Sequence, residues 1–345
     1  MRPPAFWYGP PDSLPARLLR PLGAVAGAIT AHRLARPGVR ASVPVICCGN
    51  VTLGGAGKTI VALDVARHLT AQGWCVHFLS RGYGGAARGP RRVRPGDDSA
   101  LVGDEPLLLA EVAPTWIGAD RAVSARAAIA EGAGILVLDD GLQNPTLRKD
   151  VSLLVIDGGS GFGNGQLFPA GPLREGVAEG AARCSAAVLI GPDTAGAAAA
   201  LPAGLPVLRA RLVPSPEVAA LSGRPVLAFA GIGRPGKFFT SLAEVGARLI
   251  ETKPFPDHHQ YRSAEIERLL DRAAQLGAVP VTTAKDAARL PFALRARVMI
   301  ARVSLEWEDP GLLDRILQAG ISGSPTIRAE NGARRDRANG GGRDR

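Results

Sequence analysis

Cysteine is scarce in this chain, and its four cysteines form no framework. Cys47 and Cys48 are adjacent in an apolar run, Cys75 and Cys184 are isolated, and no CxxC pair occurs. Structural zinc sites and disulfide scaffolds need paired or regularly spaced cysteines. The sequence therefore excludes both classes and predicts reduced, buried thiols in a cytosolic compartment.

Long apolar runs are also absent. The run from Pro21 to Ala31 has 11 residues, whereas a helix needs about 20 to cross a bilayer. Around it, apolar residues recur at intervals of three and four, as on one helix face: Leu14, Leu18, Leu22, Val25 and Ile29. Four arginines flank the run: Arg17, Arg20, Arg33 and Arg36. We expect an amphipathic helix lying in a membrane interface; the alternative is a helix packed on its own domain.

Aromatic residues make up only 5% of the chain, although its net charge is +10. The charge is concentrated at the ends, because residues 1–40 carry six arginines against one aspartate and residues 328–345 carry six against three acidic residues. Nucleic-acid binding typically uses a basic surface with interleaved aromatics, which the middle of the chain lacks. We therefore expect no nucleic-acid partner.

What the sequence does contain is a phosphate-binding loop in residues 45–59, where an apolar strand leads into a glycine-rich turn and a helix. In such a P-loop, backbone N–H groups surround phosphate oxygens, the lysine reaches the β/γ-phosphates and the threonine hydroxyl ligates Mg²⁺. The usual first glycine is Thr52 here, so the loop is a variant. We expect the ATP phosphates to bind at Gly54, Gly55, Ala56, Gly57, Lys58 and Thr59.

Strands and helices alternate on both sides of this loop. Apolar strand-like segments at residues 134–139 and 151–157 are typical of a buried parallel sheet. The fold class that we predict is α/β: a P-loop NTPase-like, doubly wound parallel sheet with a second, smaller α/β domain. Asp139 and Asp140 end one strand, where a Walker B-type strand presents acid toward a metal.

Composition divides the chain into four expected segments. They are a membrane-associating helix in residues 1–38, a nucleotide-binding kinase domain in 39–215, a smaller α/β domain in 216–325 and a disordered basic tail in 326–345. The main boundary follows a stretch rich in Ala, Pro and Gly.

Two more acidic groups fall on predicted loops, Asp104-Glu105 and Asp257-His258. Phosphoryl transfer needs one group that accepts the proton of the acceptor hydroxyl. Asp104 could do so, as could an Asp257–His258 pair. Taken alone, Asp104 could equally cap a helix and His258 could be a structural loop histidine.

Seven motifs in order resemble those of the tetraacyldisaccharide 4'-kinases, the lipid A 4'-kinases of Gram-negative bacteria. The resemblance runs from Phe6 to about Gln318, and it departs at Ile60, where the family often has proline, without affecting a catalytic role. The motifs are Gly49-Asn50-x-Thr52-x-Gly54-Gly55-x-Gly57-Lys58-Thr59, Ser80-Arg81-Gly82-Tyr83-Gly84, Gly103-Asp104-Glu105-Pro106, Asp139-Asp140-Gly141-x-Gln143, Pro169-Ala170-Gly171-Pro172-Leu173-Arg174-Glu175, Phe255-x-Asp257-His258-His259 and Thr282-Thr283-x-Lys285-Asp286.

The resemblance implies ATP-dependent phosphorylation of the 4'-hydroxyl of a tetraacylated glucosamine disaccharide 1-phosphate. It implies a peripheral enzyme at the cytoplasmic face of the bacterial inner membrane, which meets its lipid substrate there.

The resemblance also implies roles for individual residues. Lys58 would hold the ATP phosphates, and Asp104 would accept the proton, tuned by His258 with Asp257 in support. The remaining roles are Mg²⁺ binding by Thr59, Glu105 and Asp139, and substrate contact by Arg121 and Arg174.

Three rival functions are weaker. A P-loop switch or partitioning NTPase that acts on a protein partner would carry a lysine where this chain has Leu53, and a guanine-specific box would need a lysine at Ala284. ATP is therefore expected over GTP. A soluble small-molecule kinase would have the first helix packed on its core, and it would stay in the supernatant when anionic vesicles are pelleted at low salt. An interaction protein would not need so many acidic loop ends around a P-loop.

Overall fold

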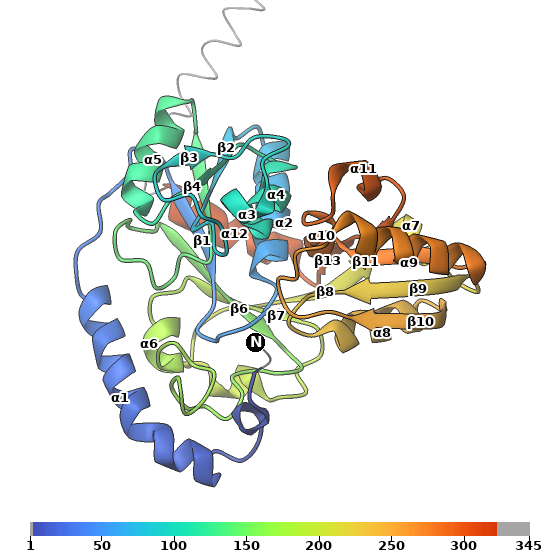
Figure 1. Ribbon diagram of the computed structural model, residues 1–345. Coiled ribbons are helices and arrows are strands. Elements are labelled where there is room, and N and C mark those ends of the chain that lie inside the picture. Colours follow the sequence, from blue (N-terminus) through green and yellow to red (C-terminus); the bar gives the residue numbers. More distant parts are fainter. Residues whose placement is uncertain (1–2, 323–345) are drawn as a thin grey trace, which may run out of the picture.

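The computed structural model describes residues 3–322, which form two α/β units side by side (Figure 1). The larger unit contains a nine-stranded sheet of order β13-β8-β7-β6-β1-β5-β2-β4-β3. Its strands are β13 (Val303–Trp307), β8 (Val207–Pro214), β7 (Ala186–Ile190), β6 (Val151–Asp157), β1 (Val45–Gly49), β5 (Ile135–Asp139), β2 (Val76–Ser80), β4 (Thr115–Ile117) and β3 (Arg91–Arg92). All neighbours pair in parallel except the two edge strands, β13 and β3.

The central strands are buried on both faces, which explains their unbroken apolar sequences. In β5, Ile135 and Val137 join one core while Leu136 and Leu138 join the other. The first core is covered by α2 (Lys58–Ala71), α4 (Asp104–Ala110) and α12 (Pro310–Ser322), and the second by α5 (Arg121–Ala130). This arrangement confirms the predicted doubly wound α/β fold.

The smaller unit is a parallel four-stranded sheet of order β10-β9-β11-β12. Its elements are α7 (Pro216–Ala219), β9 (Pro225–Ala230), α8 (Pro235–Glu244), β10 (Arg248–Pro254), α9 (Ser263–Gln275), β11 (Val279–Thr283), α10 (Ala284–Ala287), α11 (Phe292–Arg295) and β12 (Met299–Ala301). The carboxyl ends of β9 and β11 lead into segments that contact the larger unit.

The chain returns to the larger unit after β12, which differs from the expected extent of the second domain, residues 216–325. β13 pairs antiparallel with β8, and Leu313 and Leu317 of α12 pack in the first core. The physical reason is that β13 pairs with the backbone of β8, which would otherwise be an unpaired edge, while α12 buries its apolar side chains. The strand β8 itself was missed by the sequence interpretation, which placed only a boundary there. The predicted tail, residues 326–345, lies outside the described residues.

The N-terminal segment runs along the outside of the larger unit (Figure 1). η1 (Ala5–Tyr8) is fixed by Trp7, which is buried and donates from Nε1 to the carbonyl of Pro169 at 3.1 Å. In α1 (Leu14–Leu34), Ala16 and Gly23 face the protein. Among the described residues, no helix combines the length and apolar content that a bilayer crossing requires. Smaller helices complete the structure: α3 (Ser99–Val102), α6 (Val177–Ala181) and η2 (Ala197–Ala200).

Candidate active site

The P-loop connects the buried strand β1 to α2 and follows the predicted layout. Gly54 and Gly57 have φ of 114° and 89°, in the region that favours glycine. At the position of the usual glycine, Thr52 forms an antiparallel bridge to Leu173, and its Oγ1 accepts from the Asn50 side-chain amide at 2.9 Å. The loop thus stays open at Gly54 and Gly55, which are exposed.

The segment around Leu173 braces the P-loop from outside. Leu53 N donates to the carbonyl of Pro172 and Arg174 N donates to the carbonyl of Val51, both at 2.7 Å. Residues 169–175 form one of the motifs quoted above, but the sequence did not predict this contact. The brace holds the glycine-rich turn without a ligand, which limits the conformational entropy lost on binding.

Asp139, at the end of β5, lies directly beside the P-loop helix. Its Oδ2 accepts from the Thr59 hydroxyl at 2.9 Å, whereas its Oδ1 is buried without a hydrogen-bond partner. Burial, together with the charge of Glu105, raises the pKa of Asp139 to about 7. A buried, unpaired carboxylate oxygen is costly unless a cation completes it.

The oxygen donors at this point fit Mg²⁺. Thr59, Glu105 and Asp139 offer hard oxygen ligands, which Mg²⁺ prefers. Within residues 3–322, no three acidic, histidine or cysteine side chains converge as a complete metal cage. Mg²⁺ in phosphoryl-transfer sites takes only one or two carboxylates and completes its shell with phosphates and water, so the incomplete donor set agrees with that role.

Asp140, the next residue, is held by cations. Arg174 donates to both carboxylate oxygens at 2.9 to 3.1 Å, and Lys58 Nζ lies 3.8 Å from Oδ2. Although burial opposes it, Lys58 and Arg174 lower the pKa of Asp140. Asp140 has a φ of 55°, which is uncommon for a non-glycine residue. The predicted phosphate ligand Lys58 and the predicted substrate ligand Arg174 therefore meet at one carboxylate.

Asp104 and His258 come together across the two units. Asp104 begins α4, after the N-cap Gly103, and is 4% exposed. Its Oδ2 lies 3.2 Å from Nδ1 of His258, whose Nε2 lies 3.9 Å from Asp257. Burial opposes ionisation, yet contact with His258 and the charge of Lys285 lower the pKa of Asp104. The same contact raises the pKa of His258.

This geometry answers the helix-cap alternative for Asp104, while the role of His258 stays a prediction. Asp104 is not the helix N-cap, although its Oδ1 accepts from Glu105 N at 3.0 Å. His258 has a φ of 58°, which is uncommon for a non-glycine residue and marks a constrained position. Its ring also lies 5.8 Å from that of Tyr83, which is largely exposed.

Glu105 is paired with a lysine that the sequence interpretation did not single out. Lys285 Nζ, from α10 of the smaller unit, lies 2.5 Å from Glu105 Oε1. Burial alone would lower the pKa of Lys285, but the Glu105 carboxylate raises it to about 12. Lys285 stood in a quoted motif, but nothing in its local sequence reveals a partner 180 residues away.

Arg121, a predicted substrate ligand, is buried. It begins α5, is 2% exposed, and donates from Nη1 to the carbonyl of Gly118, while its Nε has no hydrogen-bond partner. Burial lowers the pKa of Arg121 to about 10, against the charge of Asp140. It thus lies near the acidic strand end, but not on an open surface.

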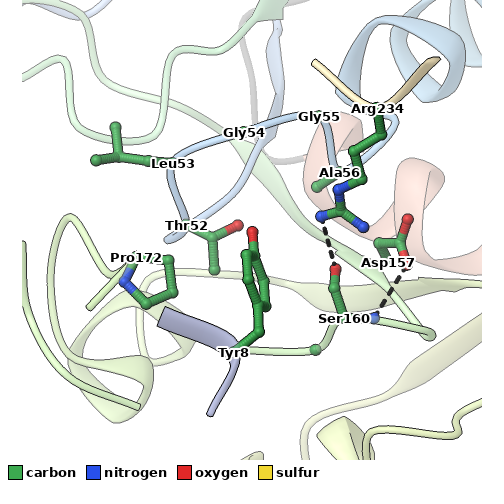
Figure 2. A pocket seen from close by; sticks show the side chains of 11 residues that line it. Tyr8, Thr52, Leu53, Gly54, Gly55, Ala56, Asp157, Ser160, Pro172 and Arg234 are labelled. Atoms are coloured by element: carbon green, nitrogen blue, oxygen red, sulfur yellow. Dashed lines mark hydrogen bonds between the residues drawn. The ribbon is translucent and has the colours of Figure 1, made fainter. Parts of the chain in front are cut away.

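A small pocket lies on the other side of the P-loop from Asp139. Figure 2 shows Gly54, Gly55 and Ala56 facing Arg234, with Tyr8 below. Arg234 of the smaller unit donates to Ser160 Oγ at 3.1 Å and stacks over the Tyr8 ring at 5.5 Å. The smaller unit therefore borders the P-loop as well as Asp104.

Comparisons with known proteins agree with one another. A family model described as Tetraacyldisaccharide-1-P 4'-kinase matches residues 15–321. A tetraacyldisaccharide 4'-kinase of Gluconacetobacter diazotrophicus is 58% identical, with 92% of this chain and 97% of the relative covered. One of Rhodospirillum centenum is 55% identical, with 94% and 98% covered.

A solved structure is similar as well. The crystal structure of LpxK from Aquifex aeolicus, described as an apo form in complex with ATP, matches with a TM-score of 0.72 and 25% identity. The match covers 89% of this chain and 99% of that one. The P-loop, the carboxylates at the strand end and the matches over nearly the whole length lead to one conclusion: this chain belongs to the tetraacyldisaccharide 4'-kinase family.

Proposed function

We propose that this protein transfers the γ-phosphoryl group of ATP to the 4'-hydroxyl of tetraacyldisaccharide 1-phosphate. Family membership supports the reaction and the nucleotide, and it favours a kinase over a switch NTPase. The observation that carries the proposal is the pairing of Asp104 with His258. This pair lies next to Glu105, whose charge acts on Asp139 beside the P-loop.

The acid–base chemistry follows from the two pKa directions. The lowered pKa keeps Asp104 ionised at neutral pH, so it can accept the hydroxyl proton. The oxygen then attacks the γ-phosphorus, its bond to the β–γ bridging oxygen breaks, and ADP leaves. The Nδ1 of His258 lies 3.2 Å from the Asp104 carboxylate, and Asp257 lies 3.9 Å from the other ring nitrogen.

The phosphate side uses other residues. The amides of residues 54–59 and the Lys58 ammonium would hold the β- and γ-phosphates. Thr59, Glu105 and Asp139 would hold Mg²⁺, which neutralises charge on those phosphates when bound. Arg174 would contact the substrate or its phosphate, whereas Arg121, the other predicted ligand, is too buried to reach either in this conformation. Arg174 would have to leave Asp140 to do so.

The lipid acceptor requires contact with a membrane, and we propose that α1 provides it at the cytoplasmic face of the bacterial inner membrane. Its apolar stripe is turned away from the protein, with exposed fractions of 56 to 70% for Leu14, Leu18, Leu22, Val25 and Ile29. Such a stripe next to arginines suits a peripheral, interfacial helix.

The reaction is tested with labelled ATP and tetraacyldisaccharide 1-phosphate in mixed micelles, comparing wild type with Lys58→Ala and Asp104→Ala. We expect labelled bisphosphorylated lipid from wild type alone. Folded wild-type protein that hydrolyses ATP and labels no lipid would show that the acceptor is wrong.

Membrane contact is tested by sedimentation with vesicles containing phosphatidylglycerol at low salt. Leu18→Glu with Leu22→Glu should weaken vesicle binding about tenfold or more, because burying each leucine contributes about 1.5–3 kcal/mol. Phe292→Glu is the matched control, since Phe292 is 89% exposed on the smaller unit. Equal binding of both variants would contradict the role of α1.

A further inference from the structure

The segment that follows β11 contains a motif to which the proposed chemistry gives no role. Thr283 caps α10, because its Oγ1 accepts from Asp286 N at 3.1 Å. One turn later, Arg289 extends back toward the larger unit. This segment brings Lys285 to Glu105 and Arg289 to Asp104, two neighbouring residues at the start of α4.

Asp286 and Arg289 form a deeply buried ion pair. Arg289 Nη2 lies 2.9 Å from Asp286 Oδ1, and the two side chains are 1% and 0% exposed. The carboxylate also accepts from Tyr261 Oη and Gly231 N, both at 2.8 Å, and from Thr283 Oγ1 at 2.6 Å. Because the Asp286 carboxylate is buried and accepts hydrogen bonds from several donors, it holds the Arg289 guanidinium in one orientation.

The Nε edge of the Arg289 guanidinium lies near the Asp104–His258 pair and donates to the Lys285 carbonyl at 3.3 Å. Its Nε lies 3.7 Å from Asp104 Oδ2, and its Nη2 donates to the carbonyl of Gly231 at 2.9 Å. That carbonyl also accepts from His258 N at 3.0 Å. The Gly231 peptide is therefore held at its N–H by Asp286 and at its oxygen by Arg289 and His258.

These hydrogen bonds to Gly231 act beside a residue with an uncommon backbone conformation, His258. The φ of 58° at His258 is one that a non-glycine residue keeps only when its surroundings determine it. Arg289 Nη1 also reaches the carbonyl of His259, at 3.5 Å. One side chain thus contacts the His259 carbonyl, the Gly231 carbonyl that His258 N binds, and the carboxylate that His258 meets.

We propose that Arg289, oriented by Asp286, is a positioning residue that sets Asp104 and His258 in reactive alignment across the two units. The inference rests on the proposed function for its kinetic test. Lysine would keep the positive charge, but a single ammonium cannot hold three acceptors in the fixed directions of a guanidinium. Arg289→Lys therefore separates positioning from charge.

The experiment compares wild type, Arg289→Lys and the matched control Arg295→Lys. Arg295 also spans the two units, through Glu111 at 2.6 Å, and within residues 3–322 no hydrogen bond or ion pair joins it to Asp104 or Gly231. We measure kcat and KM for ATP, nucleotide affinity without lipid, and hydrogen exchange of residues 255–260 in the unliganded protein. Tyr261→Phe, which removes one donor to Asp286, is measured in case Arg289→Lys does not fold.

We expect kcat of Arg289→Lys to fall about 100-fold, the size of effect that a 1 Å misplacement produces. KM for ATP and nucleotide affinity should stay within about threefold, and exchange of residues 255–260 should accelerate. Arg295→Lys should resemble wild type, and Tyr261→Phe should lose several-fold in kcat at unchanged KM.

An unchanged kcat in Arg289→Lys would overturn the proposal, as would an equal loss in Arg295→Lys or a matching loss of nucleotide affinity. In Tyr261→Phe, the overturning result is an unchanged kcat. If wild type itself transfers no phosphate to the lipid, the proposed function has failed. The exchange measurement then decides the positioning role alone, and unchanged exchange of residues 255–260 overturns it.

Discussion

The phosphate-binding edge and the proton-accepting pair are built in opposite ways. The first is local, because a strand, a glycine-rich turn and a helix within residues 45–59 set the backbone that receives phosphate. The second is assembled from two units, with Asp104 on α4 and His258 on a loop of the smaller unit, held together by ion pairs. The nucleotide-binding backbone can therefore form within one unit, whereas the proton-accepting pair forms only when the two units dock.

The largest expected effect separates the two regions. Lys58→Ala removes the cation aimed at the β/γ-phosphates, so transfer should fall about 10²–10³-fold, as for other transition-state charge ligands, with weaker nucleotide binding. Asp104→Asn should lose transfer while keeping nucleotide affinity. Titration with a fluorescent ATP analogue, alongside the transfer assay, checks both. Equal loss of nucleotide affinity in both variants would remove the distinction.

A smaller effect distinguishes two neighbours within the phosphate-binding edge. The pKa of Asp139 is raised in the folded state, so its ionisation costs stability as pH rises from the unfolded value of about 4 to the folded value of about 7, and no further above it. Asp139→Asn without nucleotide should therefore be more stable than wild type at pH 8, by up to about 4 kcal/mol, and close to wild type at pH 4.

Asp140→Asn is the matched control and should change stability in the opposite direction. Its lowered pKa means that its contribution is present above the unfolded pKa and is lost as pH falls through the folded value. Denaturant unfolding at both pH values measures the two variants. If Asp139→Asn is instead less stable than wild type at pH 8, the prediction is wrong, because the ionised Asp139 carboxylate would then be stabilised by a partner.

The smallest effect concerns docking of the units. Glu111 at the end of α4 pairs with Arg295 and Arg302 at 2.6 and 2.9 Å. Burial opposes it, but these arginines lower the pKa of Glu111, so its contribution is lost only as pH falls through that lowered value. Glu111→Gln should cost about 0.5–1 kcal/mol at pH 7, as partly exposed pairs do. Unfolding at high salt, which screens the pairs, should remove the difference, and a difference that persists there would contradict the assignment.

The sequence predicted what depends on neighbouring residues. The apolar strands ending at Gly49, Asp139 and Asp157 were recognised because burial on both faces leaves no polar alternation. The role of Thr52 in the P-loop was not, because it depends on a bridge to Leu173.

Contacts between distant segments account for the rest. β13 was missed because its pattern gains meaning only beside β8, and Lys285 and Arg289 because their partners are on α4. The roles assigned to Asp104 and His258 came from the family resemblance, and their 3.2 Å separation gives those roles a physical basis. They stay predictions until tested.

The central claim is that Asp104 and His258 act as one unit across the two halves of the protein. A double-mutant cycle of Asp104→Asn and His258→Asn in kcat for lipid phosphorylation tests it most directly. We predict that the double variant is no slower than the slower single variant, because either change disables the pair. Losses that multiply in the double variant would show that the two residues act independently and would contradict the account.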